Sequence, residues 1–146
     1  MISGAKVHFR LSQDEDGYPP VAVESLWASR TAESNEFVVD NIPFFTYEAA
    51  LGDVVRVRQE DGELWFDDVA KRSENSLLRV VFFDKEHIDE VSEKLVALGC
   101  STEHMATHSL IAVNVPASAS LAEVQAYLQE SADAGVLDYE EPILRQ

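Results

Sequence analysis

The stretch Leu77-Leu78-Arg79-Val80-Val81-Phe82-Phe83 decides the fold. Six of its seven residues are apolar and none is glycine or proline. This is the composition of a central sheet strand that is buried on most of both faces. Short strands and turns precede the stretch, whereas strand and helix patterns alternate after it. The sequence therefore predicts a β-rich half, residues 1–76, followed by an α+β half, residues 77–146.

The second half carries the signals of two helices and four strands. An apolar stripe predicts a helix between Asp84 and Gly99, and a capping box at Ser120 and Glu123 begins another that ends at Gly135. Further strands are expected at Cys100 to Ala106, Leu110 to Val115 and Val136 to Ile143. The resulting βαββαβ order is that of the ferredoxin-like fold.

The first half reads as short strands separated by turns. Val7, Phe9 and Leu11 alternate with polar residues, as in a half-buried strand. A second strand is expected over Val21 to Ala28, with Val21, Val23, Leu26 and Trp27 as its buried residues. Several short strands in this length favour a small antiparallel β-barrel-like or curled-sheet half, packed on the ferredoxin-like half.

The clearest hairpin has Asp61-Gly62 as its two-residue turn. With that turn, Val57 faces Phe66, Arg58 faces Trp65 and Arg56 faces Asp67. Such cross-strand pairs explain both arginines without a catalytic role.

Composition and charge exclude several classes of protein. Asp and Glu number 27 against 11 Lys and Arg, a net charge of −16, which repels phosphate backbones and disfavours nucleic-acid binding. The same charge attracts a basic protein. No apolar run is long enough for a membrane helix, and no signal peptide is visible. Because the single cysteine forms no internal disulfide, we expect a cytoplasmic protein.

Two groups of residues are candidates for a chemical site. Asp14, Glu15 and Asp16 resemble a cation site but lack the flanking helices and final glutamate of an EF-hand. Cys100, His104 and His108 recur every four residues, a spacing that would place them on one side of a helix. They are predicted to lie on a strand and a loop, where this spacing does not bring them to one face, and a fourth zinc ligand is missing. For Cys100 to act as a base-activated nucleophile, one of these histidines would have to lie beside its thiol in the folded chain, and one sequence does not reveal such a contact. We therefore predict no catalytic residue, no metal and no cofactor.

Several segments carry a family resemblance, and they are mostly turns and strand cores. They are Asp16-Gly17-Tyr18-Pro19-Pro20-Val21, Asn41-Ile42-Pro43-Phe44-Phe45, Gly52-Asp53-Val54-Val55, Leu64-Trp65-Phe66, Ser76-Leu77-Leu78-Arg79-Val80 and Tyr139-Glu140-Glu141-Pro142. On them the chain resembles an uncharacterised bacterial family, domain of unknown function 4265. In size and charge such families are similar to immunity proteins, which neutralise toxins delivered between cells.

The function we expect is that of a non-enzymatic acidic binding protein, of the immunity type, that contacts a basic toxin domain directly. The expected partner-binding residues are the acids Asp14, Glu15, Asp16, Asp138, Glu140 and Glu141. One alternative is a dimeric ferredoxin-like module that senses a small metabolite. Another is a hydrolase or metal enzyme that uses Cys100, His104 and His108.

Overall fold

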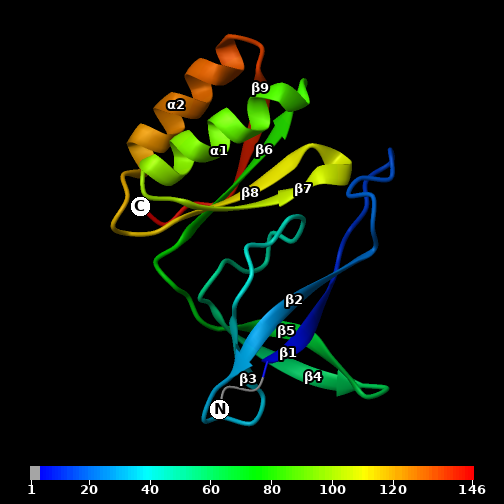
Figure 1. The fold of residues 1–146 in the computed structure, drawn as a ribbon. Helices are drawn as coiled ribbons and strands as arrows, with labels where there is room; N and C mark the ends of the chain where they lie inside the picture. The colour runs from blue at the N-terminus through cyan, green and yellow to red at the C-terminus, as the bar shows by residue number, and fades with distance from the viewer. Residues whose placement is uncertain (1–3) are drawn as a thin grey trace. The chain divides into compact units, whose positions relative to one another are not determined.

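The computed structural model describes residues 4–146, which form nine β-strands, two α-helices and two 3₁₀ turns. The α+β class predicted from the sequence is confirmed. The chain divides into two compact units, one that ends at Ser73 and one that spans Glu74–Gln146. We call them unit 1 and unit 2 and describe each by itself (Figure 1).

Unit 1 is a closed barrel in which each strand neighbours the next along the chain, in the order β1-β2-β3-β4-β5. Its strands are β1 (Gly4–Arg10), β2 (Val23–Arg30), β3 (Glu36–Val39), β4 (Val54–Glu60) and β5 (Glu63–Lys71). All neighbours are antiparallel except β1 and β5, which close the barrel as a parallel pair. The predicted curled sheet is therefore present, and it is closed on itself.

The barrel interior is built by alternate residues of each strand. On β1 the inward residues are Val7 and Phe9, as the alternation predicts. On β2 they are Glu24, Leu26 and Ala28, so the predicted burial of Val21, Val23 and Trp27 is wrong. Glu24 takes an inward position because backbone N–H groups donate to its carboxylate. Since side chains alternate along a strand, Val23 and Trp27 then point outward.

The hairpin of β4 and β5 turns at Asp61 and Gly62, whose φ values are 53° and 80°. Two positive φ values fit the tight turn predicted from Asp-Gly. The pairings of Val57 with Phe66 and of Arg58 with Trp65 are confirmed. The pairing of Arg56 with Asp67 is wrong, since an irregularity between Arg56 and Val57 shifts the register and sets Arg56 opposite Asp68.

Unit 2 is a four-stranded antiparallel sheet in the order β7-β8-β6-β9, with both helices on one face (Figure 1). Its elements are β6 (Ser76–Phe82), η1 (Lys85–His87), α1 (Ile88–Ala97), β7 (Ser101–Met105), η2 (Ala106–His108), β8 (Leu110–Val115), α2 (Leu121–Asp133) and β9 (Leu137–Ile143). The stretch that decides the fold supplies β6, a central strand of this sheet.

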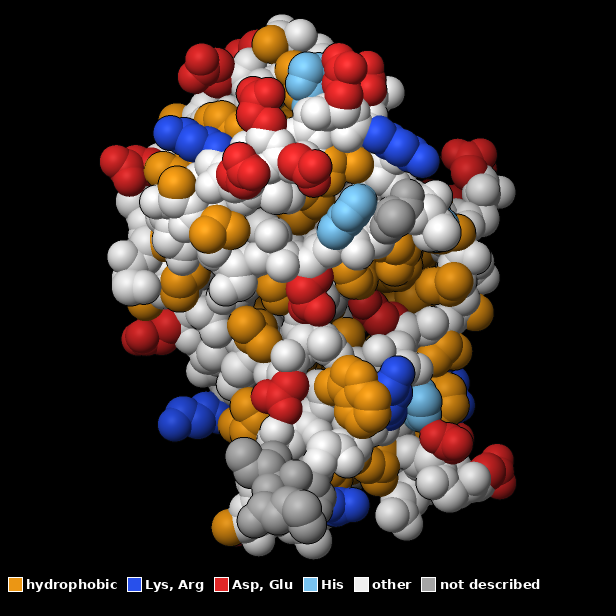
Figure 2. All heavy atoms as spheres, in the orientation of Figure 1, with side chains coloured by type: hydrophobic (Ala, Val, Ile, Leu, Met, Phe, Trp, Pro, Cys, Tyr) orange, Lys and Arg blue, Asp and Glu red, His pale blue; other side chains and the backbone are white. Residues whose placement is uncertain are grey.

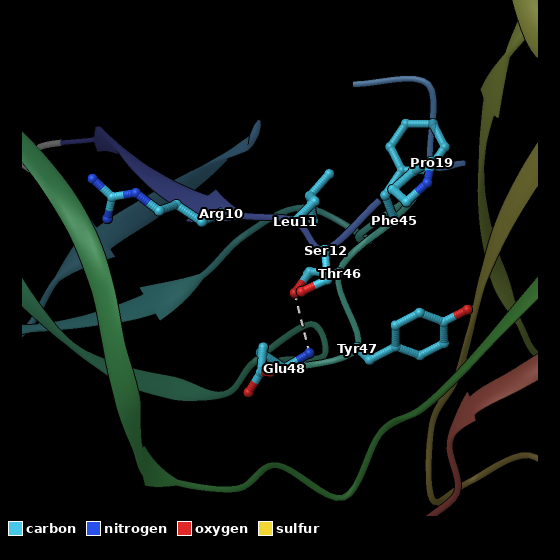
Figure 3. Close-up of a pocket in the computed structure, with 8 residues that line it drawn as sticks. All are labelled: Arg10, Leu11, Ser12, Pro19, Phe45, Thr46, Tyr47 and Glu48. Carbon is cyan, nitrogen blue, oxygen red and sulfur yellow. Dashed lines mark hydrogen bonds between the residues drawn. The ribbon is translucent and has the colours of Figure 1, made fainter. Parts of the chain in front are cut away.

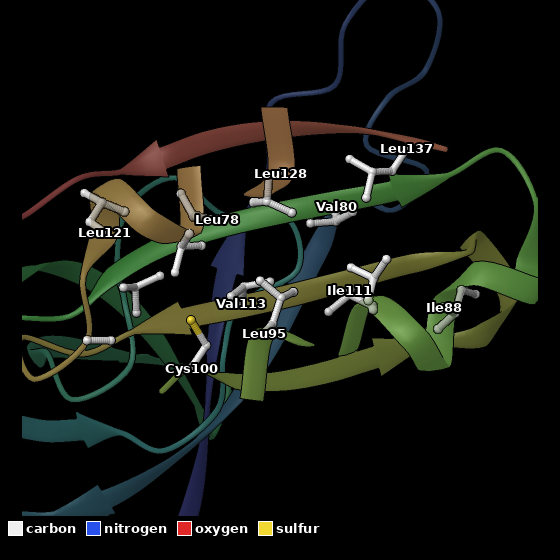
Figure 4. Packing of buried hydrophobic residues seen from close by; sticks show 14 of the residues in the cluster. Leu78, Val80, Ile88, Leu95, Cys100, Ile111, Val113, Leu121, Leu128 and Leu137 are labelled. Atoms are coloured by element: carbon white, nitrogen blue, oxygen red, sulfur yellow. The ribbon is translucent and has the colours of Figure 1, made fainter. Parts of the chain in front are cut away.

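The core of unit 2 lies between the sheet and the helices (Figure 4). Leu78 and Val80 of β6 face Leu95 of α1 and Leu128 of α2 within this core. All four side chains are fully removed from water, and burial of a leucine or valine stabilises a fold by about 1.5–3 kcal/mol. The apolar stripe predicted between Asp84 and Gly99 is therefore the face that holds α1 on the sheet, and α2 is held by a similar apolar face.

The helix ends also follow the sequence signals. Asp84 accepts a hydrogen bond from the backbone of Glu86 at 3.0 Å, and so caps the 3₁₀ turn that leads into α1. Ser120 accepts one from the backbone of Glu123 at 3.2 Å and caps α2. Within the described residues, no helix has the length and apolar character that crossing a bilayer requires.

Candidate functional site

The predicted acids Asp14, Glu15 and Asp16 form the tight turn between β1 and β2. The Asp14 carboxylate accepts hydrogen bonds from the backbone N–H groups of Asp16 and Tyr18, both at 2.9 Å. A backbone bond from Gly17 to the Asp14 carbonyl closes the turn. Asp14 therefore shapes the loop, while Glu15 and Asp16 are exposed to solvent.

The other predicted acids lie on β9, which is an edge strand of the sheet of unit 2. Asp138 and Glu141 are exposed, and Glu141 accepts a hydrogen bond from Gln125 of α2. Glu140 is partly buried and forms an ion pair with Arg79, at 3.3 Å between Nη1 and Oε1. Charge at an edge strand discourages pairing with other strands, so these acids have a structural use as well.

Cys100 lies in the core of unit 2, as the label in Figure 4 shows. Burial raises the pKa of its thiol to about 11, which suppresses the reactive thiolate. His104 is exposed on β7, and the ring of His108 is hydrogen-bonded to Thr107 at 2.9 Å. Among the described residues, no three His, Cys, Asp or Glu side chains come together in a way that would hold a metal ion.

Two buried carboxylates hold the long loop between β3 and β4. Glu24 accepts three backbone hydrogen bonds, from Phe44 at 2.6 Å, Phe45 at 3.1 Å and Thr46 at 2.8 Å. Asp53, at the far end of the loop, accepts from Ala50 at 2.9 Å and from Ser73 at 2.8 Å. Because charge-assisted bonds are stronger than neutral ones, the loop is fixed although it forms no strand.

A pocket of about 220 Å³ lies between this loop and the segment that follows β1 (Figure 3). Its lining combines apolar, hydroxyl and charged side chains, which are Arg10, Leu11, Ser12, Pro19, Phe45, Thr46, Tyr47 and Glu48. Glu24 fixes one wall through its three bonds. Gln13 donates to the carbonyl of Pro19 at 3.0 Å and ties the two ends of the acidic turn together on the other wall. Side-chain bonds to the backbone therefore shape both walls.

The charged groups at the pocket differ in what they bind. The guanidinium of Arg10 lies 4.0 Å from the ring centroid of Trp65 and donates to Glu60 at 3.3 Å. Neither Glu60 nor Trp65 lines the pocket, so this positive charge is engaged elsewhere. The Glu48 carboxylate makes no hydrogen bond or ion pair with another residue in the part of the chain that the structure describes. The pocket is therefore bordered by an available negative charge.

A second arrangement crosses the outer surface of the barrel. His8 of β1 is paired with Ser25 of β2 on one side and with Trp65 of β5 on the other. Its Nδ1 lies 2.6 Å from Ser25 Oγ, and its Nε2 lies 2.6 Å from Glu63 Oε2. Three side chains from three strands are thus connected in one hydrogen-bonded row.

Comparison with known proteins places the chain in a family. The sequence model of a protein family, described as "Domain of unknown function (DUF4265)", matches residues 24–139. The chain belongs to this family. No curated protein matches it significantly. A solved structure, titled "Novel crystal structure of a hypothetical protein from Neisseria gonorrhoeae", is similar to it with a TM-score of 0.72 and 22% identity, over 100% of this chain and 97% of the other. At that identity the likeness shows the fold alone.

The match to the DUF4265 model begins at Glu24 and includes one wall of the pocket, Phe45–Glu48. The turn motifs on which the resemblance rests have a physical meaning in the DUF4265 fold. Gly52 adopts a φ of 83°, and Asp53 beside it caps the loop that forms the pocket wall. These motifs thus describe how the loop is held.

Sequence reasoning missed Glu24 and the Ser25–His8–Glu63 row of this DUF4265 protein. Glu24 shares the inward face of β2 with Leu26 and Ala28, but a glutamate in the sequence does not indicate a buried position. No local signal existed for the row, because Glu63 is 55 residues from His8 in the chain. The sequence indicates only that His8 alternates with Val7 and Phe9, which places it on the polar side of its strand.

Proposed function

We propose that this DUF4265 protein is an acidic binding protein that docks on a basic protein partner, as an immunity protein docks on a toxin domain. The observation that carries the proposal is the preformed pocket of unit 1, which is bordered by Glu48 and lies at the base of the acidic turn Asp14–Asp16. A rigid pocket reduces the entropy cost of binding, and the nearby acids attract a positively charged surface.

The pocket suits a single lysine or arginine side chain. At about 220 Å³ it is smaller than the roughly 300–1,000 Å³ of most ligand sites. Leu11, Phe45 and Pro19 offer an apolar lining for the aliphatic part of such a side chain. Glu48 then offers a carboxylate to its charged end. Anchors of this kind supply much of the binding energy of protein interfaces.

Unit 2 supports the same function through charge. Helices α1 and α2 together carry six acids and one lysine. In the view of Figure 2, acidic side chains crowd over this helical layer. Such a field accelerates encounter with a basic partner and depends on ionic strength. The exposed acids Asp138 and Glu141 of β9 add to it.

The test uses a basic toxin domain encoded beside the gene. We expect a salt-sensitive complex that is weakened about tenfold or more by Glu48→Gln, as calorimetry would measure. A change of 1.4 kcal/mol corresponds to that factor. The matched control is Glu130→Gln on α2, which removes the same charge from a residue that does not line the pocket. Absence of any complex with the neighbouring basic domain would contradict the proposal, and equal effects of the two variants would exclude the pocket as the anchor.

We also infer that unit 2 is a ferredoxin-like domain. Its element order βαββαβ and its strand order β7-β8-β6-β9 support this interpretation. A dimeric ligand-sensing module remains the alternative function on this basis. A thermal-shift screen with small metabolites, together with light scattering, tests it. A dimer that a metabolite stabilises would favour sensing, and a monomer with no stabilising metabolite would exclude it.

A further inference from the structure

The hydrogen bonds of the row Ser25–His8–Glu63 determine which ring nitrogen of His8 carries the hydrogen. The carboxylate of Glu63 only accepts hydrogen bonds, so Nε2 of His8 carries the hydrogen that it donates. In the neutral imidazole, Nδ1 then has a lone pair and accepts from the hydroxyl of Ser25 at 2.6 Å. The serine proton is therefore directed at a base whose orientation a carboxylate fixes.

We propose that Ser25 is a base-activated nucleophile that takes an acyl group from an activated ester. Nucleophile, base and orienting acid within hydrogen-bond reach are the requirement for activation of a serine. The side chain of His8 is 18% exposed and that of Glu63 is 59% exposed. Ser25 is also exposed, so an ester can reach its hydroxyl from solvent.

The step balances as an ordinary acyl transfer. Ser25 Oγ attacks the carbonyl carbon of the ester while its proton moves to His8 Nδ1. The tetrahedral adduct collapses, the bond from carbon to the leaving oxygen breaks, and the proton passes from His8 to the leaving alcohol or phenol. The products are an acylated Ser25 and the free alcohol or phenol.

The neighbouring residues indicate an aromatic leaving group with negative charge. Lys6 and Trp27 form the next outward cross-strand pair beside His8 and Ser25. The Lys6 ammonium lies 4.9 Å from the Trp27 ring centroid, and the ring is half exposed. The indole offers a stacking surface and the ammonium a positive charge, which together suit a phenolate.

The experiment uses the full chain and p-nitrophenyl acetate. We expect release of nitrophenolate, an added acetyl group in the intact mass, and peptide mapping of that group to Ser25. Ser25→Ala should abolish this adduct. His8→Ala should slow its formation about 100-fold, since general base catalysis contributes roughly 10²–10⁴-fold. Glu63→Gln should slow it less, because the base remains but its orientation is weakened.

The matched control is Ser29→Ala. Ser29 lies on the same strand and donates to the carboxylate of Asp40, with no imidazole in the bond. Its loss should leave acylation unchanged. Tryptophan fluorescence and circular dichroism show whether each variant is folded. A fluorophosphonate probe gives a second readout, because its phosphorus bonds to an activated serine as fluoride leaves.

Three results would overturn the inference. They are an acetyl group on His8 or a lysine without any on Ser25, an unchanged rate in a folded His8→Ala variant, and no phosphonylation of Ser25. Each would mean that the row only stabilises the barrel through cross-strand hydrogen bonds.

Discussion

Glu24 is the residue on which the wall of the pocket depends. Its Oε1 accepts from Phe45 and Thr46, and its Oε2 accepts from Phe44. Removal of the carboxylate in Glu24→Ala leaves these backbone donors without their partner, and we expect unit 1 to lose about 3 kcal/mol. Glu24→Gln keeps one acceptor oxygen and should cost about half as much. Urea unfolding followed by tryptophan fluorescence measures both, since Trp27 and Trp65 both lie in unit 1.

The control for this prediction is Glu48→Gln, which alters an exposed carboxylate of the same loop. Surface changes of this kind cost less than about 0.5 kcal/mol. A cost that small for Glu24→Ala would mean that the loop is held by other contacts.

Cys100 should make the stability of unit 2 fall as the pH rises through the alkaline range. Burial raises the pKa of its thiol to about 11, against about 8.5 for a thiol in an unfolded chain. Because the folded pKa is raised, this stabilisation is complete below about pH 8.5 and is lost as the pH rises through about 11, by roughly 3 kcal/mol in all. The helical signal in circular dichroism reports it, since α1 and α2 both belong to unit 2.

A Cys100→Ala variant isolates the contribution of the thiol. Burial also raises the pKa of Tyr127 and of Tyr139, so both proteins should lose stability at high pH. The native protein should lose more over this interval. Parallel curves for the two proteins would show that the thiol does not titrate as proposed.

At the scale of elements, the end of α1 is set by Gly99. Its φ is +100°, and a Cβ at this position would lie 3.1 Å from the Cβ of Ala119. Gly135 after α2 has a φ of +78° but nothing within 4 Å of such a Cβ. Gly99→Ala should therefore cost about 2 kcal/mol and Gly135→Ala about 1 kcal/mol, as urea unfolding of the helical signal would measure. Equal costs would show that the contact with Ala119 adds nothing.

The elements also show what the sequence could predict. The helices of unit 2 have caps, stripes and glycine stops, so their positions were predictable to within a few residues. The register of β2 was not, because Trp27 looks like a core residue and Glu24 does not, and only the bonds to Phe44–Thr46 reverse that assignment. The pocket was beyond prediction, since it joins two loops that no local pattern brings together.

At the scale of the whole molecule, negative charge is carried by both units but is balanced differently. Unit 1 has 14 acids and 7 bases, and unit 2 has 13 acids and 4 bases. Several bases of unit 1 are in ion pairs on the barrel, such as Arg56 with Asp68 at 2.8 Å and Arg58 with Glu60 at 2.7 Å. Repulsion among like charges is therefore less compensated in unit 2.

This difference predicts that the two units respond differently to salt. Raising the ionic strength from 0.01 M to 0.15 M shortens the screening length from about 30 Å to about 8 Å. Unit 2 should become more stable, because its carboxylates repel each other less, whereas unit 1 should gain little or lose stability as its surface ion pairs are screened. Thermal unfolding followed by the helical signal for unit 2 and by tryptophan fluorescence for unit 1 separates the two. A larger gain in unit 1 than in unit 2 would mean that the ion pairs of the barrel do not offset its repulsion. Sodium chloride and potassium fluoride should act alike if screening is the cause, because specific anion binding would distinguish the two salts.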